Sequence, residues 1–306
     1  MAIRLLVVLA VMLLIHLLPT IPRYRRHGWF HQWTDQHADS DGAAFVAWTL
    51  LPPLIVCGVI SILLWQAPMM HVLWGVFAGG VLAYSLGPRD LDQDIKAVLQ
   101  AEDPDKQEKL AQRLRATDDH DRLPFTAPCL VHATVWAGLQ RRFAVIFWFL
   151  LLGPVGALGY RLVRLLLVDG TNSVSTVEDG SDDPDDLAIP PARGRAAARR
   201  LGEMLDWPAA HLMVLAMALV SDFDAVVRAW RNWHSDARNV ARHFDPGFLS
   251  AVARAGVNAD LEAGDADTRD TSDVLAELAD ARRLLHRVMM VWLTIAALVV
   301  LGGWFV

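Results

Sequence analysis

Hydrophobic residues along this chain gather in long blocks that polar segments separate. The blocks cover Arg4–Pro19, Ala43–Trp65, Met69–Tyr84, Phe143–Val168, Pro208–Val220 and Val288–Val306. A helix needs about 20 residues to cross the hydrocarbon core of a bilayer. The first, second, fourth and sixth blocks therefore predict membrane-spanning helices, and the third nearly reaches this length with its flanks. The fifth block is too short alone, so it either extends the preceding Ala196–Trp207 helix or only dips into the membrane.

The polar segments also predict helices. One buried helix face is indicated by the spacing of Leu91, Ile95, Val98 and Leu99. From Ser272, a single helical pattern continues to the C-terminus. Because no segment shows convincing strand alternation, the predicted fold class is all-α, a polytopic helical membrane protein with cytoplasmic helical regions.

Arginine and lysine positions predict the orientation, since these residues are enriched in short cytoplasmic loops. Basic residues occupy Arg23–Arg26, the region Arg89–Arg142 and the segment Arg282–Arg287. The turn Gln66–Pro68 is uncharged. Both chain ends are therefore expected outside and the basic segments inside, with the side of residues 169–207 left open.

Four regions follow from this pattern. Residues 1–86 form an N-terminal three-helix membrane region, and 87–142 a cytoplasmic helical region. Residues 143–220 hold a membrane segment broken by glycine and proline, an acidic loop and a short membrane segment. Residues 221–306 are cytoplasmic helices that lead into a C-terminal membrane helix.

Composition supports membrane residence. The chain of 306 residues is 54% hydrophobic, and its 12 tryptophans match the aromatic belt of a membrane protein. The mean hydropathy is +0.30. The net charge of −6 is mild and its basic residues are scattered among acids, so the expected partner is the lipid bilayer and not nucleic acid. Cys57 and Cys129 fall in separate segments and are expected to be free thiols.

The run from Gly153 to Arg161 is the candidate site. Glycine and proline weaken or bend a spanning helix, and arginine at bilayer depth is costly unless it snorkels or finds a partner. Gly153 and Ala157 could serve close helix packing, or the break could line a ligand site. Arg161 and Arg164 share a helix face, where they either snorkel or meet an anion or an acidic side chain such as Glu203 or Asp206.

Metal and nucleophile chemistry find less support. His27, His31 and Asp35 share one helical face, but the aromatic residues around them favour an interfacial amphipathic helix over a zinc site. The chain has no Walker-type phosphate loop, and no serine, histidine and acid combination has the spacing of a catalytic triad. No catalytic residue, metal or cofactor is therefore expected.

A family likeness is carried by Phe147-Trp148, the run from Gly153 to Arg161, and Leu205-Asp206-Trp207-Pro208. In these residues the chain resembles the AmpE-like membrane proteins, which are related to the cobalamin-biosynthesis membrane enzymes of the CobD/CbiB type. The AmpE branch is associated with regulation of β-lactamase induction alongside peptidoglycan recycling. The resemblance covers most of the chain in layout, and its specific motifs cover about a quarter.

The synthase branch carries polar groups that this chain lacks. Its Glu-Asn-x-x-Asp stretch is matched here by Trp136, Ala137 and Gln140, and the asparagine of its Tyr-Arg/Lys-x-x-Asn pattern by Arg164. Its Arg-Leu-Asp-Asp becomes Arg200-Leu201-Gly202-Glu203. These losses make adenosylcobinamide-phosphate synthase activity the alternative function and not the first one.

The resemblance therefore implies a multi-pass regulatory protein of the bacterial inner membrane, linked to β-lactamase induction and cell-wall recycling. It would act by binding a small anionic ligand or a protein partner rather than by catalysis. The predicted ligand-binding residues are Gly153, Pro154, Gly156, Tyr160, Arg161, Arg164, Glu203 and Asp206.

Overall fold

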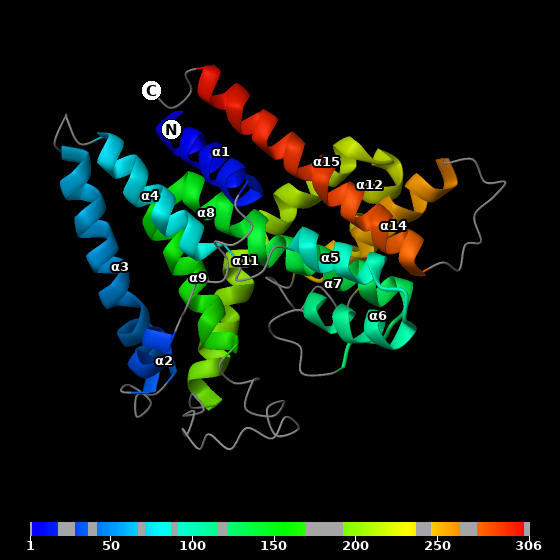
Figure 1. The fold of residues 1–306 in the computed structure, drawn as a ribbon, viewed down its shortest axis with the longest axis horizontal. Coiled ribbons are helices and arrows are strands. Elements are labelled where there is room, and N and C mark those ends of the chain that lie inside the picture. The colour runs from blue at the N-terminus through cyan, green and yellow to red at the C-terminus, as the bar shows by residue number, and fades with distance from the viewer. Residues whose placement is uncertain are drawn as a thin grey trace. The chain divides into compact units, whose positions relative to one another are not determined.

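The computed structural model is built of helices, and its described residues contain no strand (Figure 1). It describes residues 2–17, 28–35, 42–66, 71–86, 91–115, 122–168, 192–236, 246–263 and 274–302. The predicted all-α fold class is confirmed. The chain divides into two compact units, each made of two separate stretches of sequence: Met1–Pro88 with Val145–Gly202, and Arg89–Ala144 with Glu203–Val306.

The first unit holds most of the N-terminal apolar blocks. Its helices are α1 (Ala2–Leu17), α2 (Gly28–Asp35), α3 (Gly42–Gln66), α4 (His71–Ser85), most of α8 (Ala144–Leu152), α9 (Pro154–Val168) and the start of α11 (Ala192–Val220). Helix α4 packs against α1, α3 and α9, and α3 also packs against α9. Ala78 and Leu82 of α4 are fully buried in this packing. Helix α4 is thus the centre of the unit.

The second unit is built around α7 (Ala127–Gly138) and α15 (Val274–Leu301). Its other elements are α5 (Leu91–Gln100), α6 (Pro104–Ala111), the 3₁₀ turn η3 (Gln112–Leu114), the π-helical segment η4 (Leu139–Phe143), the rest of α11, α12 (Phe223–Ser235) and α14 (Phe248–Ala263). Helix α7 packs against α14 and α15, and α5 packs against α6 and α15. A Cβ on Gly138 would lie 3.2 Å from Leu285, and the rings of Phe143 and Trp292 are 5.4 Å apart. Residue numbers rise together along both helices, from Gly138 beside Leu285 to Phe143 beside Trp292. Helices α7 and α15, with η4 continuing α7, therefore run in the same direction and pack closely.

Among the described residues, four helices are long and apolar enough to cross a membrane, and on this evidence the protein is a multi-pass membrane protein. They are Gly42–Gln66, Ala127–Leu152, Ala196–Val220 and Val274–Leu301. The first and last match the predicted second and sixth blocks. Many of their large apolar side chains are exposed, such as Leu63 at 61% and Leu298 at 62%, which suits a surface that faces lipid.

Two other blocks differ from the prediction. The first block forms a shorter apolar helix, because α1 has 16 residues. The fourth block does not form one spanning helix: the chain breaks at Gly153, and its first part joins α7 and η4 in the candidate span Ala127–Leu152. The apolar pattern missed this span because Arg141 and Arg142 interrupt it.

The fifth block continues the helix before it, which was one of the two alternatives left open. Helix α11 runs unbroken from Ala192 to Val220 with Pro208 inside it. The predicted buried helix face is also present: Leu91, Ile95 and Val98 of α5 are buried, and Leu99 is half-buried. Asp103 caps the next helix, α6, as its carboxylate accepts a hydrogen bond from the backbone N–H of Asp105 at 3.2 Å.

The boundaries of the two units differ in part from those of the four predicted regions. The predicted boundaries after residues 86 and 142 lie near the unit boundaries after Pro88 and Ala144. The predicted region 143–220, however, is divided at Gly202, in the middle of α11. The acidic loop expected within residues 174–191 lies outside the described residues.

Candidate functional site

The predicted break is a sharp corner between α8 and α9. Gly153 adopts a φ of 73°, a left-handed conformation that glycine accepts without a Cβ penalty. Its backbone N–H donates to Phe149 O at 2.8 Å and so ends α8. Pro154 is the first residue of α9, where its missing N–H costs nothing. The chain therefore stops one helix and starts another within two residues.

Gly156 lets the two helices approach closely at this corner. A Cβ at this position would lie 2.3 Å from the carbonyl oxygen of Trp148 and 2.7 Å from Cβ of Leu152. Both distances are shorter than atoms tolerate, and the first neighbour is backbone, which cannot turn away. Gly156 is therefore required by packing at the corner.

Arg4 of α1 completes the corner. Its Nη1 donates to the carbonyl oxygens of Leu150 at 3.0 Å and Leu151 at 2.9 Å. These carbonyls belong to the last turn of α8, where backbone acceptors lack partners within the helix and the helix dipole favours a cation. A Cβ on Gly153 would lie 3.6 Å from the Arg4 guanidinium. Arg4 thus acts as a side-chain cap for the broken helix.

Two cations follow the corner on α9. Arg161 is 8% exposed and Arg164 is 2% exposed. The Nε of Arg164 donates to the Tyr160 hydroxyl at 3.2 Å, and its guanidinium carbon lies 5.5 Å from the Tyr160 ring centroid. A snorkelling side chain keeps its charged end in water. These two arginines are instead enclosed by protein.

Arg161 also acts electrostatically on the hydroxyl of Tyr84 in α4. That hydroxyl accepts a hydrogen bond from Nε1 of Trp29 in α2 at 2.8 Å. The positive charge of Arg161 therefore reaches a polar contact between two other helices of the same unit.

Glu203 and Asp206 follow Gly202 on α11. A Cβ on Gly202 would lie 3.8 Å from Nη1 of Arg164. Asp206 lies one helical turn further along and is 2% exposed, whereas Glu203 is half-buried. Both acids belong to the second unit. Their expected role in balancing Arg161 and Arg164 stays a prediction.

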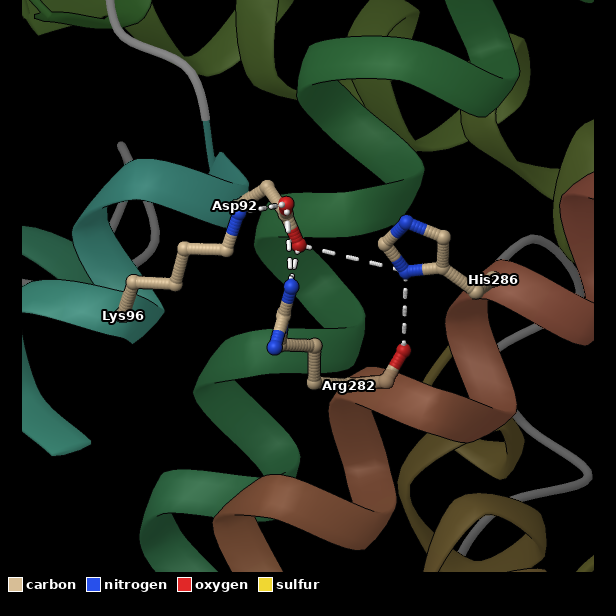
Figure 2. Close-up of polar contacts among 4 residues, drawn as sticks. All are labelled: Asp92, Lys96, Arg282 and His286. Atoms are coloured by element: carbon tan, nitrogen blue, oxygen red, sulfur yellow. Dashed lines mark hydrogen bonds and ion pairs between the residues drawn. The ribbon is translucent and has the colours of Figure 1, made fainter.

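The second unit holds a different polar centre, around Asp92 of α5 (Figure 2). Nε of Arg282 in α15 donates to Asp92 Oδ1 at 2.6 Å, and Nη2 donates to Oδ2 at 3.2 Å. Nζ of Lys96 lies 3.3 Å from Oδ2, and Nδ1 of His286 lies 3.9 Å from Oδ1. Arg282 therefore binds the carboxylate through two donors, with two further basic groups beside it.

These basic groups set the protonation of Asp92. Burial of the carboxyl opposes ionisation and raises its pKa. The hydrogen bond and charge of Arg282, the charge of His286 and the hydrogen bond from Lys96 outweigh burial and lower the pKa from 3.8 to about 2. Asp92 is thus a carboxylate at neutral pH and ties α5 to α15.

A second aspartate of α5 binds the neighbouring candidate span. Nη1 of Arg141 in η4 donates to Asp94 Oδ2 at 2.9 Å, and its Nη2 donates to Arg113 O at 2.6 Å. Asp94 is 6% exposed. A π-helical segment shifts the direction of side chains relative to an α-helix. Two spanning candidates, Ala127–Leu152 and Val274–Leu301, are therefore each tied to α5 by an ion pair.

One serine and one histidine also meet in the second unit. Nδ1 of His132 in α7 contacts Oγ of Ser250 in α14, and Nε1 of Trp136 donates to the same oxygen at 3.2 Å. This arrangement joins two packed helices through side-chain hydrogen bonds. Within the described ranges, no group of three or more histidine, cysteine, aspartate or glutamate residues could hold a metal ion.

Cys57 and Cys129 are free thiols, as expected. The helix predicted around His31 is present as α2, and its interfacial position stays a prediction. His27 and the side chains of His31 and Asp35 lie outside the described parts of the chain.

Sequence reasoning missed several residues of these centres, among them Arg4, Asp92 and Arg282. Arg4 stands at the start of an apolar block, where a cation is common, and its partners lie 146 and 147 positions away. Asp92 and Arg282 are 190 positions apart. Contacts between residues so far apart in the sequence are seen only in the three-dimensional structure.

The predicted ligand residues of the first unit, in contrast, do form one local structure. Gly153, Pro154 and Gly156 build the corner, and Tyr160 contacts Arg164 one turn later.

No family model matches this chain, and neither the curated proteins nor the solved structures searched give a match.

Proposed function

We propose that this protein is a regulatory protein of the bacterial inner membrane, similar to the AmpE-like proteins, that relays a cell-wall signal in β-lactamase induction. It does so by binding a small anionic ligand, or the anionic group of a protein partner, beside the α8–α9 corner. The residues that bind are Arg161 and Arg164, with Tyr160 positioning Arg164. The family assignment rests on the sequence resemblance alone.

The observation that carries the ligand proposal is the burial of Arg161 and Arg164 one helical turn apart. Burying two like charges is costly unless negative charge comes near them. An anionic ligand beside α9 would bring such negative charge to the two arginines.

The corner supports binding because it is rigid. Arg4 caps α8 through two hydrogen bonds, and Gly156 is packed against the Trp148 backbone. A rigid support holds Tyr160 and Arg164 in place before a ligand arrives, which lowers the entropy cost of binding. An arginine fork presents several donors at fixed angles and suits phosphate or carboxylate groups.

Regulation is favoured over catalysis by the side chains that occupy the positions of the synthase motif. Trp136 stands where the synthase pattern begins with an acid, and its indole N–H donates to Ser250 in a helix–helix contact. Gln140, at another of these positions, is buried. In this chain these side chains pack helices together.

The test replaces both arginines, Arg161→Leu and Arg164→Leu, in a host with an inducible β-lactamase. We expect loss of induction by a β-lactam, with unchanged amounts of the protein in the membrane fraction. Arg200→Leu is the matched control, since Arg200 is exposed at the start of α11, and it should leave induction intact.

Unchanged induction in the double variant would refute the site. A second variant is used if the leucine variant does not accumulate in the membrane. Arg161→Lys with Arg164→Lys keeps both positive charges but removes the planar guanidinium groups. That variant should be present in the membrane with induction reduced; full induction would argue against arginine-specific recognition of an anion.

A further inference from the structure

One face of α15 changes character abruptly along its length. Arg283, His286 and Arg287 are exposed and are followed on the same face by Met290, Leu298 and Leu301. Spacings of three and four residues place all six positions within one stripe of a helix. The stripe therefore begins with cationic side chains and continues with apolar ones.

The opposite face of α15 packs inside the second unit. Leu278, Leu284 and Val288 are fully buried, and α15 packs against α5, α7 and α14. The stripe is thus the outer side of the helix within this unit, with His286 at its edge, where Nδ1 lies 3.9 Å from Asp92 Oδ1 of α5. Its side chains are well exposed, with Arg283 at 59%, His286 at 51% and Met290 at 65%.

The apolar part of the stripe suits lipid. Met290, Leu298 and Leu301 are exposed by 65%, 62% and 82%. The one hydroxyl on this stretch, Thr294, donates to Met290 O of its own helix at 2.8 Å and so needs no water. Helix α15 is also one of the four candidate spans.

The cationic part of the stripe suits an anionic headgroup. Between Arg283 and Leu301 the sequence has no acidic residue. Asp280, which accepts a hydrogen bond from Arg283 at 2.6 Å, has a side chain only 8% exposed, whereas the Arg283 side chain is 59% exposed. Clusters of basic residues directly beside a spanning helix attract anionic lipids.

We infer that this stripe, from Arg283 to Leu301, binds an anionic phospholipid, with Arg283 and Arg287 at its phosphate and Met290 and Leu298 along an acyl chain. Charge complementarity and the adjoining apolar surface select this occupant. A soluble acidic protein or a nucleic acid would match the cations but would leave the apolar side chains uncovered. This inference is independent of the site at Arg161 and Arg164.

The experiment uses the full chain in detergent, with phosphatidylglycerol and phosphatidylcholine of identical acyl chains competing for it, and counts retained lipids by native mass spectrometry. We expect phosphatidylglycerol to be preferred. Arg283→Gln with Arg287→Gln should reduce that preference on the order of tenfold, because each basic residue near a membrane surface contributes to the attraction.

Two controls make the result decisive. Arg113→Gln with Arg122→Gln removes two exposed arginines of the same unit away from α15 and should leave the preference unchanged. If the α15 variant does not fold, high salt should weaken the preference of the unaltered protein, because salt screens exposed charges.

Several results would overturn the inference. The first is equal retention of the two lipids by the unaltered protein, and the second is a preference that survives loss of both arginines or high salt. The third is binding of glycerol phosphate as tight as that of the lipid, since the acyl chain would then contribute nothing along Met290 and Leu298.

Discussion

Arginines serve different purposes in the two units of this protein. In the first unit, Arg4 donates to backbone carbonyls and Arg164 to a tyrosine hydroxyl. In the second unit, Arg141, Arg282 and Arg283 donate to the carboxylates of Asp94, Asp92 and Asp280. A carboxylate offsets the charge of the guanidinium it binds, whereas a neutral oxygen orients the guanidinium.

The two regions are therefore suited to different roles. Ion pairs in the second unit tie α5 to two candidate spanning helices and give a mechanical connection. The contacts described for Arg4 and Arg164 fix geometry around a helix corner. The first arrangement suits structural coupling, and the second positions Arg164, which we propose binds an anion.

The largest effect is expected from Gly156→Ala. The added methyl group would collide with the Trp148 carbonyl, which lies 2.3 Å from the Cβ position, so α8 and α9 must separate. We expect a loss of about 3 kcal/mol or more in the free energy of unfolding, measured by thermal unfolding in detergent. Gly80→Ala is the control, since its Cβ meets nothing within 4 Å. Equal stability of the two variants would mean that the corner is not tightly packed.

A smaller loss is expected from Arg4→Leu. This change leaves the carbonyls of Leu150 and Leu151 without the charged donor that the structure gives them. Hydrogen bonds to charged groups contribute about 1.5–3 kcal/mol, so a loss of about 2–3 kcal/mol is expected. Arg4→Lys should recover part of it. If Arg4→Leu unfolds at the same temperature as the unaltered protein, Arg4 does not hold the corner.

Acid should loosen the second unit through Asp92. Its pKa is lowered from 3.8 to about 2 in the folded protein, so the unfolded chain binds a proton first as the pH falls. The stabilisation is complete above about pH 4 and is lost as the pH falls through about 2, amounting to about 2 kcal/mol. Hydrogen exchange of α5 amides reports it. Asp92→Asn should remove this part of the pH dependence, and an unchanged acid profile would exclude the contribution of Asp92.

The smallest effect is expected from Ser250→Ala. Trp136 and His132 would each lose a contact with the Ser250 hydroxyl, which costs about 1 kcal/mol. Ser235→Ala is the matched control, because this exposed hydroxyl donates only to Asn232 O of its own helix. Thermal unfolding should separate the two variants. A loss of hydrolase-like labelling by a serine-reactive probe, in place of a stability change, would assign Ser250 a chemical role.

The sequence predicted local structure well because local structure follows local pattern. The apolar spacing from Leu91 to Val98 predicted the buried face of α5, and the lipid-grade runs predicted Gly42–Gln66 and the end of α15. Glycine followed by proline marked the corner at Gly153, since one accepts a positive φ and the other starts a helix.

Contacts between residues far apart in the sequence were not predicted. One candidate span was also missed, because charged residues interrupt its apolar pattern. The span Ala127–Leu152 was missed because Arg141 and Arg142 interrupt its apolar run, and Asp94 compensates the first of them. Nothing in the sequence linked Arg4 to the carbonyls of α8, because backbone atoms carry no sequence signature. The ion pair between Asp92 and Arg282 likewise joins residues that are 190 positions apart.

Binding beside the α8–α9 corner is tested by identifying the small molecules that the purified protein carries. Native mass spectrometry of the full chain should detect a bound anionic molecule that is lost from Arg161→Gln with Arg164→Gln and kept in Arg200→Gln. The same molecule retained by the double variant, with its fold intact, would contradict the proposal that the two buried arginines bind it.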